Sequence, residues 1–132
     1  MGIPAEVATL AGHVAAADAV VISGPEYNKS ISGVLNNSLD WISRVQGNPW
    51  LDKPVAILSA TAGRTGGEAT QFALRLAMVS FRPMLISGPA VMIAGAANEF
   101  DDAGALTNLR NAATLTELMN NPRAAATSQT KG

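Results

Sequence analysis

Two short loops hold the residues of this chain that are best suited to binding chemistry. The first loop, Pro25-Glu26-Tyr27-Asn28, directly follows Gly24 and the apolar run at 19–23. Proline presets the backbone, tyrosine offers a flat ring, and asparagine tolerates a tight turn while it donates and accepts hydrogen bonds. This combination suits a planar ligand with polar edges, although the same four residues can also make a plain turn.

The second loop, residues 61–67, follows another apolar run at 55–60 and contains Gly63, Gly66 and Gly67. Glycines allow a ligand to approach the backbone closely, and the start of a helix presents amide N–H groups. The loop lacks the Gly-Lys-Ser/Thr ending of a nucleotide-binding P-loop. Arg64 could neutralise an anion, but we favour a solvated side chain. The glycines could equally serve turn geometry alone.

Other reactive groups are scarce. The chain has no cysteine, which excludes disulfides, thiolate metal sites and cysteine nucleophiles. Its only histidine, His13, lies on an expected helix among alanines, and we interpret it as a surface or packing residue. The sequence therefore predicts neither a catalytic acid–base residue nor a metal site.

The pattern of apolar residues predicts alternating helices and strands around these loops. Helices are expected at 4–17, about 33–45, 68–79 and 105–120, and strands at 19–23, 55–60 and 90–94. This order indicates an α/β fold with a parallel sheet and right-handed crossovers. Such sheets bind ligands at the carboxyl ends of their strands, where both loops should lie side by side.

Some finer expectations follow from the same pattern. The consecutive apolar residues at 19–23 suit a strand covered on both faces. Leu35, Leu39 and Ile42 form one buried helical stripe. A further set falls on one face of the helix at 68–79: Ala69, Phe72, Leu76 and Val79.

Composition limits the class of protein. Of 132 residues, 48% are hydrophobic and 14% charged, which indicates one globular domain at 1–120, followed by a polar, disordered tail at 121–132. The net charge of −1 leaves no basic surface for nucleic acid. The longest apolar stretch, 84–97, is shorter than the roughly 20 residues that span a bilayer. We expect a soluble protein with no membrane or nucleic-acid partner, and the absence of cysteine fits a cytoplasmic location.

Four motifs in succession resemble the NADPH-dependent FMN reductase family of flavodoxin-like proteins. They are P-E-Y-N at 25–28, S-I-x-G at 30–33, L-x-N-x-x-D-W at 35–41 with S-R following at 43–44, and G-x-x-G-G at 63–67. The resemblance covers residues 5 to 120. Ser32 stands where the family usually has proline.

The resemblance implies a site for FMN between the two loops, which hold the isoalloxazine and ribityl regions largely through backbone groups. One wall would be Pro25, Glu26, Tyr27 and Asn28, and the other Thr61, Ala62, Gly63, Gly66 and Gly67. It also implies hydride transfer from NADPH or NADH through FMN to free flavin, a quinone or a similar acceptor. A homodimer or homotetramer is also expected. The helix that carries Trp41, Ile42 and Arg44 is one that family members often use in dimer packing, although Trp41 could equally be a core residue.

Family members begin with a strand, a phosphate-binding GS-x-R-x-x-S loop, a helix and a second strand, and the resemblance here starts after these elements. The implied fold is therefore a flavodoxin-like parallel sheet with helices on both faces, shortened at its N-terminus, with about three strands and four helices. Without the phosphate loop, FMN affinity should fall by ~1000-fold or more. One alternative is a non-catalytic binding or assembly module that has lost tight FMN binding. The least favoured alternative is a flavodoxin-like electron carrier, because the chain lacks the acidic surface of such carriers.

Overall fold

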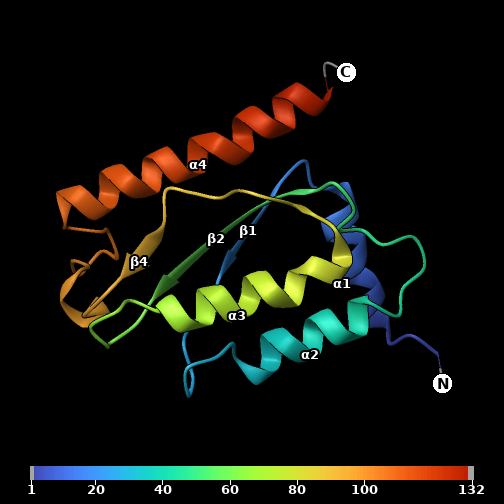
Figure 1. Cartoon of the computed structure of the whole chain (residues 1–132), viewed down its shortest axis with the longest axis horizontal. Helices are drawn as coiled ribbons and strands as arrows, with labels where there is room; N and C mark the ends of the chain where they lie inside the picture. The colour runs from blue at the N-terminus through green and yellow to red at the C-terminus, as the bar shows by residue number, and fades with distance from the viewer. Residues whose placement is uncertain (1, 131–132) are drawn as a thin grey trace.

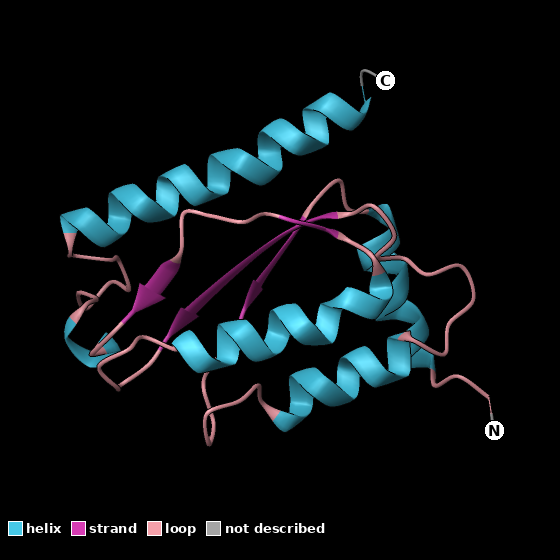
Figure 2. Cartoon of the chain, in the orientation of Figure 1, coloured by secondary structure: helices cyan, strands magenta, loops and turns pink. Residues whose placement is uncertain are grey.

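A computed structural model describes residues 2–130 as an open parallel sheet flanked by helices (Figures 1 and 2). In chain order the elements are α1 (Ala5–Ala16), β1 (Val20–Ser23), α2 (Gly33–Ile42), β2 (Pro54–Ala60), α3 (Glu68–Met78), the 3-10 turn η1 (Val79–Phe81), β3 (Met84–Leu85), β4 (Val91–Ile93), the 3-10 turn η2 (Ala96–Asn98) and α4 (Leu109–Thr130). Within the described residues no helix combines the length and apolar character needed to cross a membrane.

Strand β2 is the centre of the sheet. On one edge it pairs with β1, and on the other edge it pairs first with β3 and then with β4, always in parallel. The expected third strand at 90–94 is β4, and β3 adds a short ladder before it. Gly88 and Pro89 separate the two pieces, since proline has no N–H to donate to a ladder.

Helices cover both faces of the sheet, as the sequence predicts. Val55 and Ile57 of β2 pack in one cluster with residues of α1, α2 and α3. The alternate residue Ala56 packs in a second cluster with β4 and with Leu118 of α4. In Figure 1, α2 and α3 lie below the sheet and α4 above it. The period-two alternation of β2 thus decides which helix each residue meets.

Strand β1 departs from the expectation of cover on both faces. Ile22 is buried against the cluster of α1 to α3, but Val21, which is paired with Ala56, remains 45% exposed. Among the described strands, β1 pairs only with β2, so its outer edge has no ladder partner. Helix α4 covers β2 and β4 and leaves this side of β1 open to solvent.

Helix α2 forms as its sequence predicts. The Ser32 hydroxyl accepts a hydrogen bond from the N–H of Leu35 at 3.1 Å, which caps the first turn. Leu39 and Ile42 are buried and Leu35 packs against the same cluster. Serine therefore replaces the family's proline with a side-chain cap. Ile42 is buried in the core and Trp41 is half-buried, and a role of this helix in a dimer contact stays a prediction.

Helix α3 is oriented differently from what its apolar residues suggest. The face containing Phe72, Leu76 and Val79 points to solvent, and these side chains are 63%, 76% and 63% exposed. The face turned to the sheet instead carries Thr70, Gln71, Leu74 and Met78. Polar residues occupy this inner face because they bind the loops around the candidate site, as described below.

Helix α4 replaces the predicted tail. It begins after Asn108, whose side-chain oxygen accepts from the N–H groups of Arg110 and Asn111. It continues to Thr130, so the prediction of disorder is wrong for residues 121–130, while 131–132 lie outside the described residues. Pro122 is buried, and Gln129 Nε2 donates to the carbonyl of Asp52 at 2.7 Å. These tertiary contacts, together with three helix-favouring alanines at 124–126, outweigh the backbone hydrogen bond lost at Pro122.

Candidate functional site

The two predicted loops meet at the carboxyl ends of β1 and β2. The strands are parallel and in register from Val20 opposite Val55 to Ser23 opposite Leu58, so the segments that follow them leave the sheet at the same edge. The Gly24 N–H donates to the Leu58 carbonyl at 3.0 Å and extends the ladder into the first loop. The sheet thereby fixes where both loops begin.

The first turn of α3 joins the loops to each other. The Glu26 carboxylate accepts a hydrogen bond from the backbone N–H of Thr70 at 2.9 Å. The Thr70 hydroxyl donates to the carbonyl of Pro25 at 3.0 Å. Thr70 lies in the first turn of α3, where backbone N–H groups have no partner within the helix. Glu26 therefore satisfies this helix end and positions the first loop.

Beyond Glu26 the first loop makes a tight hairpin that displays its tyrosine. Tyr27 and Ser30 exchange two backbone hydrogen bonds of 3.0 Å. Asn28 and Lys29 between them have φ values of 51° and 65°, the left-handed conformation that two-residue hairpins require. The Tyr27 side chain is 61% exposed. The loop thus presents a flat ring and the polar side chain of Asn28 at the sheet edge.

In the second loop, Gly66 and Gly67 are required for packing. Both have positive φ, and a Cβ on Gly66 would lie 2.5 Å from the Met92 carbonyl carbon. A Cβ on Gly67 would lie 2.6 Å from Ser59 Oγ. Gly63 meets only the Thr61 hydroxyl, at 3.7 Å. Close approach of the backbone to β2 and β4 therefore explains two of the three glycines, whereas a Cβ at Gly63 would make only an ordinary van der Waals contact.

Two buried polar side chains, Ser59 of β2 and Gln71 of α3, hold the glycine loop in place. The Ser59 hydroxyl donates to the Gly66 carbonyl at 2.6 Å, and Gln71 Nε2 donates to Ser59 Oγ at 2.8 Å. Gln71 Nε2 also donates to the Val91 carbonyl at 2.8 Å. Gln71 is 2% exposed, and its Oε1 has no partner among the described atoms. The pattern of apolar residues gave no sign of these two side chains, since a lone serine in a strand and a glutamine in a helix are usually solvated.

The glycine loop leaves hydrogen-bond donors free. Within the described chain, the backbone N–H groups of residues 62–67 make no hydrogen bond. They precede the N-terminus of α3, where the helix dipole also favours negative charge. Lys29 and Arg64, the cationic side chains of the two loops, are exposed. The loop can therefore donate hydrogen bonds to oxygen or nitrogen acceptors of a ligand.

A third loop, which the sequence pattern does not reveal, packs beside the second. After β4, the Gly95 N–H donates to the Gly63 carbonyl at 3.1 Å, and the Ala96 N–H donates to the Thr61 carbonyl at 2.9 Å. Gly95 adopts the left-handed conformation that allows the chain to turn here. The turn η2 therefore buttresses the far side of the glycine loop.

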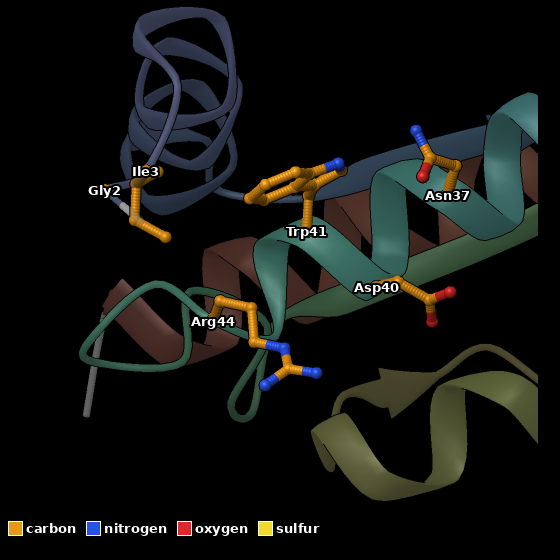
Figure 3. A pocket seen from close by; sticks show the side chains of 6 residues that line it. All are labelled: Gly2, Ile3, Asn37, Asp40, Trp41 and Arg44. Carbon is orange, nitrogen blue, oxygen red and sulfur yellow. The ribbon is translucent and has the colours of Figure 1, made fainter.

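The site is an open surface that the two loops form at the sheet edge, called the ledge below. A cavity of about 600 Å³ lies elsewhere and is lined by Gly2, Ile3, Asn37, Asp40, Trp41 and Arg44 (Figure 3). It lies between the segment before α1 and α2, and the Trp41 ring extends from α2 toward Ile3, whereas the guanidinium of Arg44 points away from Ile3. We assign the candidate site to the loops, because they hold the unpaired donors. No group of three or more potential metal ligands occurs among the described residues.

The structure thus brings all nine predicted site residues to one edge of the sheet. Tyr27, Asn28 and Gly63 have surfaces that a ligand can reach, whereas Glu26, Gly66 and Gly67 are used in holding the loops. Contact of any of them with FMN stays a prediction. Ser59, Thr70, Gln71 and Gly95 join the site as positioning residues.

Comparisons with known proteins agree with this architecture. The chain matches the NADPH-dependent FMN reductase family over residues 1–98. It is 42% identical over 106 residues to the NAD(P)H-dependent FMN reductase PA1204 of Pseudomonas aeruginosa, covering 80% of this chain and 57% of that protein. It is 42% identical over 91 residues to a quinone reductase of Escherichia coli, covering 69% of this chain and 48% of that protein.

Among solved structures, FerB of Paracoccus denitrificans, a flavoenzyme NAD(P)H:(acceptor) oxidoreductase, matches with a TM-score of 0.78 and 28% identity. The match covers 93% of this chain and 66% of FerB, and it confirms the flavodoxin-like fold. The chain spans about half the length of the curated relatives it matches. By its sequence and its fold, the chain belongs to the NADPH-dependent FMN reductase family.

Proposed function

We propose that this chain carries the isoalloxazine side of the flavin site of an FMN-dependent NAD(P)H oxidoreductase. The reaction would pass hydride from NADPH or NADH through FMN to free flavin, a quinone or a similar acceptor. The observation that carries the proposal is the joining of the Pro25–Asn28 loop to the glycine loop through Glu26 and Thr70, which makes a single ledge.

The residues of the ledge fit the ring system of FMN. Its edge carries carbonyl oxygens and ring nitrogens, which accept hydrogen bonds from N–H groups such as those left free at residues 62–67. Tyr27 offers a flat apolar surface beside them. The chemistry that FMN supplies when bound is the acceptance and release of hydride. The chain's own share is to bind the ring, orient it and shield one side of it from water.

The fit to the FMN phosphate is weaker. The cations at these loops are only Lys29 and Arg64, and both are exposed. Charge-assisted hydrogen bonds to a phosphate contribute roughly 1.5–3 kcal/mol each, so their number largely sets FMN affinity. We therefore propose that this chain binds the flavin chiefly through its ring.

The cellular setting is part of the same proposal. We infer a cytoplasmic, small-molecule reductase that assembles as a homodimer or homotetramer. The names of the relatives support a reductase of small molecules, and the absence of cysteine suits a reducing compartment.

The proposal is tested by purifying the chain in the presence of FMN and following both bound flavin absorbance and NADPH oxidation. We expect a yellow protein whose thermal unfolding midpoint rises with FMN concentration, since a ligand that binds only the folded state stabilises it. A colourless, inactive protein whose unfolding is unchanged by FMN would favour a non-catalytic module.

A further inference from the structure

Buried hydrogen bonds connect β4 to the glycine loop in one direction only. Gln71 Nε2 donates to the Val91 carbonyl and to Ser59 Oγ, and the Ser59 hydroxyl donates in turn to the Gly66 carbonyl. Both ends of this chain of bonds are carbonyl oxygens, which can only accept. A flipped Gln71 amide would set its own oxygen against the Val91 oxygen. The Ser59 proton is therefore committed to the Gly66 carbonyl.

This arrangement is unfavourable for stability alone. Ser59 is fully buried and Gln71 is 2% exposed, yet Gln71 Oε1 has no partner among the described atoms. A buried polar atom without a partner destabilises the fold, and an apolar side chain of similar shape would avoid that cost. An unsatisfied group in a buried network therefore calls for a role beyond packing. The group that this network places is the Gly66 carbonyl.

The direction of the Gly66 carbonyl decides where the next N–H group points. The peptide bond between Gly66 and Gly67 is trans. In a planar trans peptide the C=O and the N–H point in opposite directions. Because the carbonyl points to the buried Ser59 hydroxyl, the Gly67 N–H points away from it. Ser59 and Gln71 thus fix the orientation of a backbone donor that they do not touch.

The Gly67 N–H is a donor without an acceptor in the described chain. Gly67 is buried, and its N–H makes no hydrogen bond to any residue that the structure describes. Thr65 and Glu68, on either side of the two glycines, are exposed, so the donor lies just inside the surface of the loop. Buried N–H groups are nearly always paired in folded proteins. The Gly67 N–H therefore indicates an acceptor that comes from another molecule.

We propose that Ser59 and Gln71 are positioning residues of the flavin site, which aim the Gly67 N–H at the polar edge of the FMN ring. The inference rests on the proposed function. A hydride carries two electrons and one proton, so its transfer to FMN adds one negative charge to the ring. A hydrogen bond to a charged acceptor is roughly twice as strong as one to a neutral acceptor. The aimed donor therefore favours the reduced ring over the oxidised ring.

The reduction potential of FMN bound to the whole chain tests the role of the two side chains. It reports the ratio of the dissociation constants of oxidised and reduced FMN. Ser59→Ala and Gln71→Leu should each change this ratio by about tenfold in favour of oxidised FMN, which lowers the potential by about 30 mV for a two-electron couple. Ile57→Val is the matched control, because Ile57 is buried in the same strand among apolar residues. It should lower stability and leave the ratio unchanged.

A spectroscopic measurement follows the donor itself. In nitrogen–proton correlation spectra of the labelled chain, the Gly67 amide proton should move downfield on addition of lumiflavin, the flavin ring system without the ribityl phosphate. The reason is that this N–H gains an acceptor. The Gly12 amide, inside α1, should not move. In Ser59→Ala the shift of the Gly67 amide should be smaller, because the preceding carbonyl is no longer held.

The outcomes separate this inference from the proposed function. A wild-type chain whose spectra are unchanged by lumiflavin and by FMN would overturn both. A chain that binds flavin while its Gly67 amide stays in place would overturn only the inference. So would equal changes of the ratio in Ser59→Ala, Gln71→Leu and Ile57→Val. Circular dichroism shows whether each variant is folded, and the wild-type amide shift tests the donor without any variant.

Discussion

Glu26 Oε1 accepts a hydrogen bond from the backbone N–H of Thr70 at 2.9 Å, across 44 positions of the sequence. The bond places a carboxylate at the N-terminus of α3, where it meets an unpaired N–H and the positive end of the helix dipole. It also holds the loop at residues 25–28 against α3, the helix that begins where the glycine loop ends. One side chain thereby fixes the geometry of the whole ledge.

Glu26→Ala should lower the free energy of unfolding by about 1–3 kcal/mol, because it leaves the Thr70 N–H without its charged acceptor. Glu26→Gln keeps an oxygen acceptor and should lose less. Urea unfolding measures both. The control is Glu117→Ala on the exposed side of α4, which should change stability by less than about 0.5 kcal/mol. Equal losses for Glu26→Ala and Glu117→Ala would contradict the bond's role.

Gly67→Ala should destabilise the protein by more than about 2 kcal/mol. The new Cβ would lie 2.6 Å from Ser59 Oγ, and the residue has a φ of +96°. Gly12→Ala is the opposite control, since Gly12 lies inside α1 with nothing near its missing Cβ. It should stabilise the protein by roughly 0.5–1 kcal/mol. Thermal unfolding of the two variants should therefore shift in opposite directions, and a shift of the same sign would refute this assignment of Gly67.

Ser59→Ala and Gln71→Leu should show strong coupling. Each removes one member of the chain of bonds from Val91 through Gln71 and Ser59 to Gly66, and leaves a buried polar partner unsatisfied. We expect the double variant to be more stable than the sum of the single losses predicts, with a coupling free energy of about 0.5–3 kcal/mol. Additive losses in a double-mutant cycle would show that the two side chains act independently.

Deleting residues 121–132 should destabilise the domain by about 2 kcal/mol. The deletion removes buried Pro122 and the hydrogen bonds of Asn121 and Gln129 to Gly88 and Asp52. Removing only 131–132 is the control and should have no effect. If both deletions leave the urea midpoint unchanged, the last turns of α4 contribute no stability.

The sequence predicts the order of elements and the meeting of the loops well, because period-two and period-3.6 apolar patterns report burial directly. Leu39, Ile42, Val55 and Ile57 all lie in the core as their spacing indicates. The tail was mispredicted because its small and polar residues and its terminal position are typical of disorder, and Pro122 favours the end of a helix. Here its burial and the Gln129 contact outweigh that preference, and no local pattern contains either contact.

The orientation of α3 could not be predicted for a related reason. Apolar periodicity identifies a face that avoids water, but it does not distinguish a core from a surface that another molecule covers. Gln71 and Thr70 could turn inward only because Ser59, Val91 and Pro25 offer them hydrogen bonds. Those partners are distant in the sequence. The roles of Glu26 and the glycines as loop supports depend on the same long-range contacts.

The central claim is that the two loops form the ring-binding side of a flavin site. Titrating the chain with FMN and with lumiflavin tests this claim most directly, because lumiflavin has the ring system but no ribityl phosphate. Flavin fluorescence should be quenched saturably by both, with similar dissociation constants. Tyr27→Ala should raise both constants by about 2–10-fold, while Tyr27→Phe, which keeps the ring, should change them little. Absence of saturable quenching by either flavin, or equal affinities in wild type and Tyr27→Ala, would contradict the account.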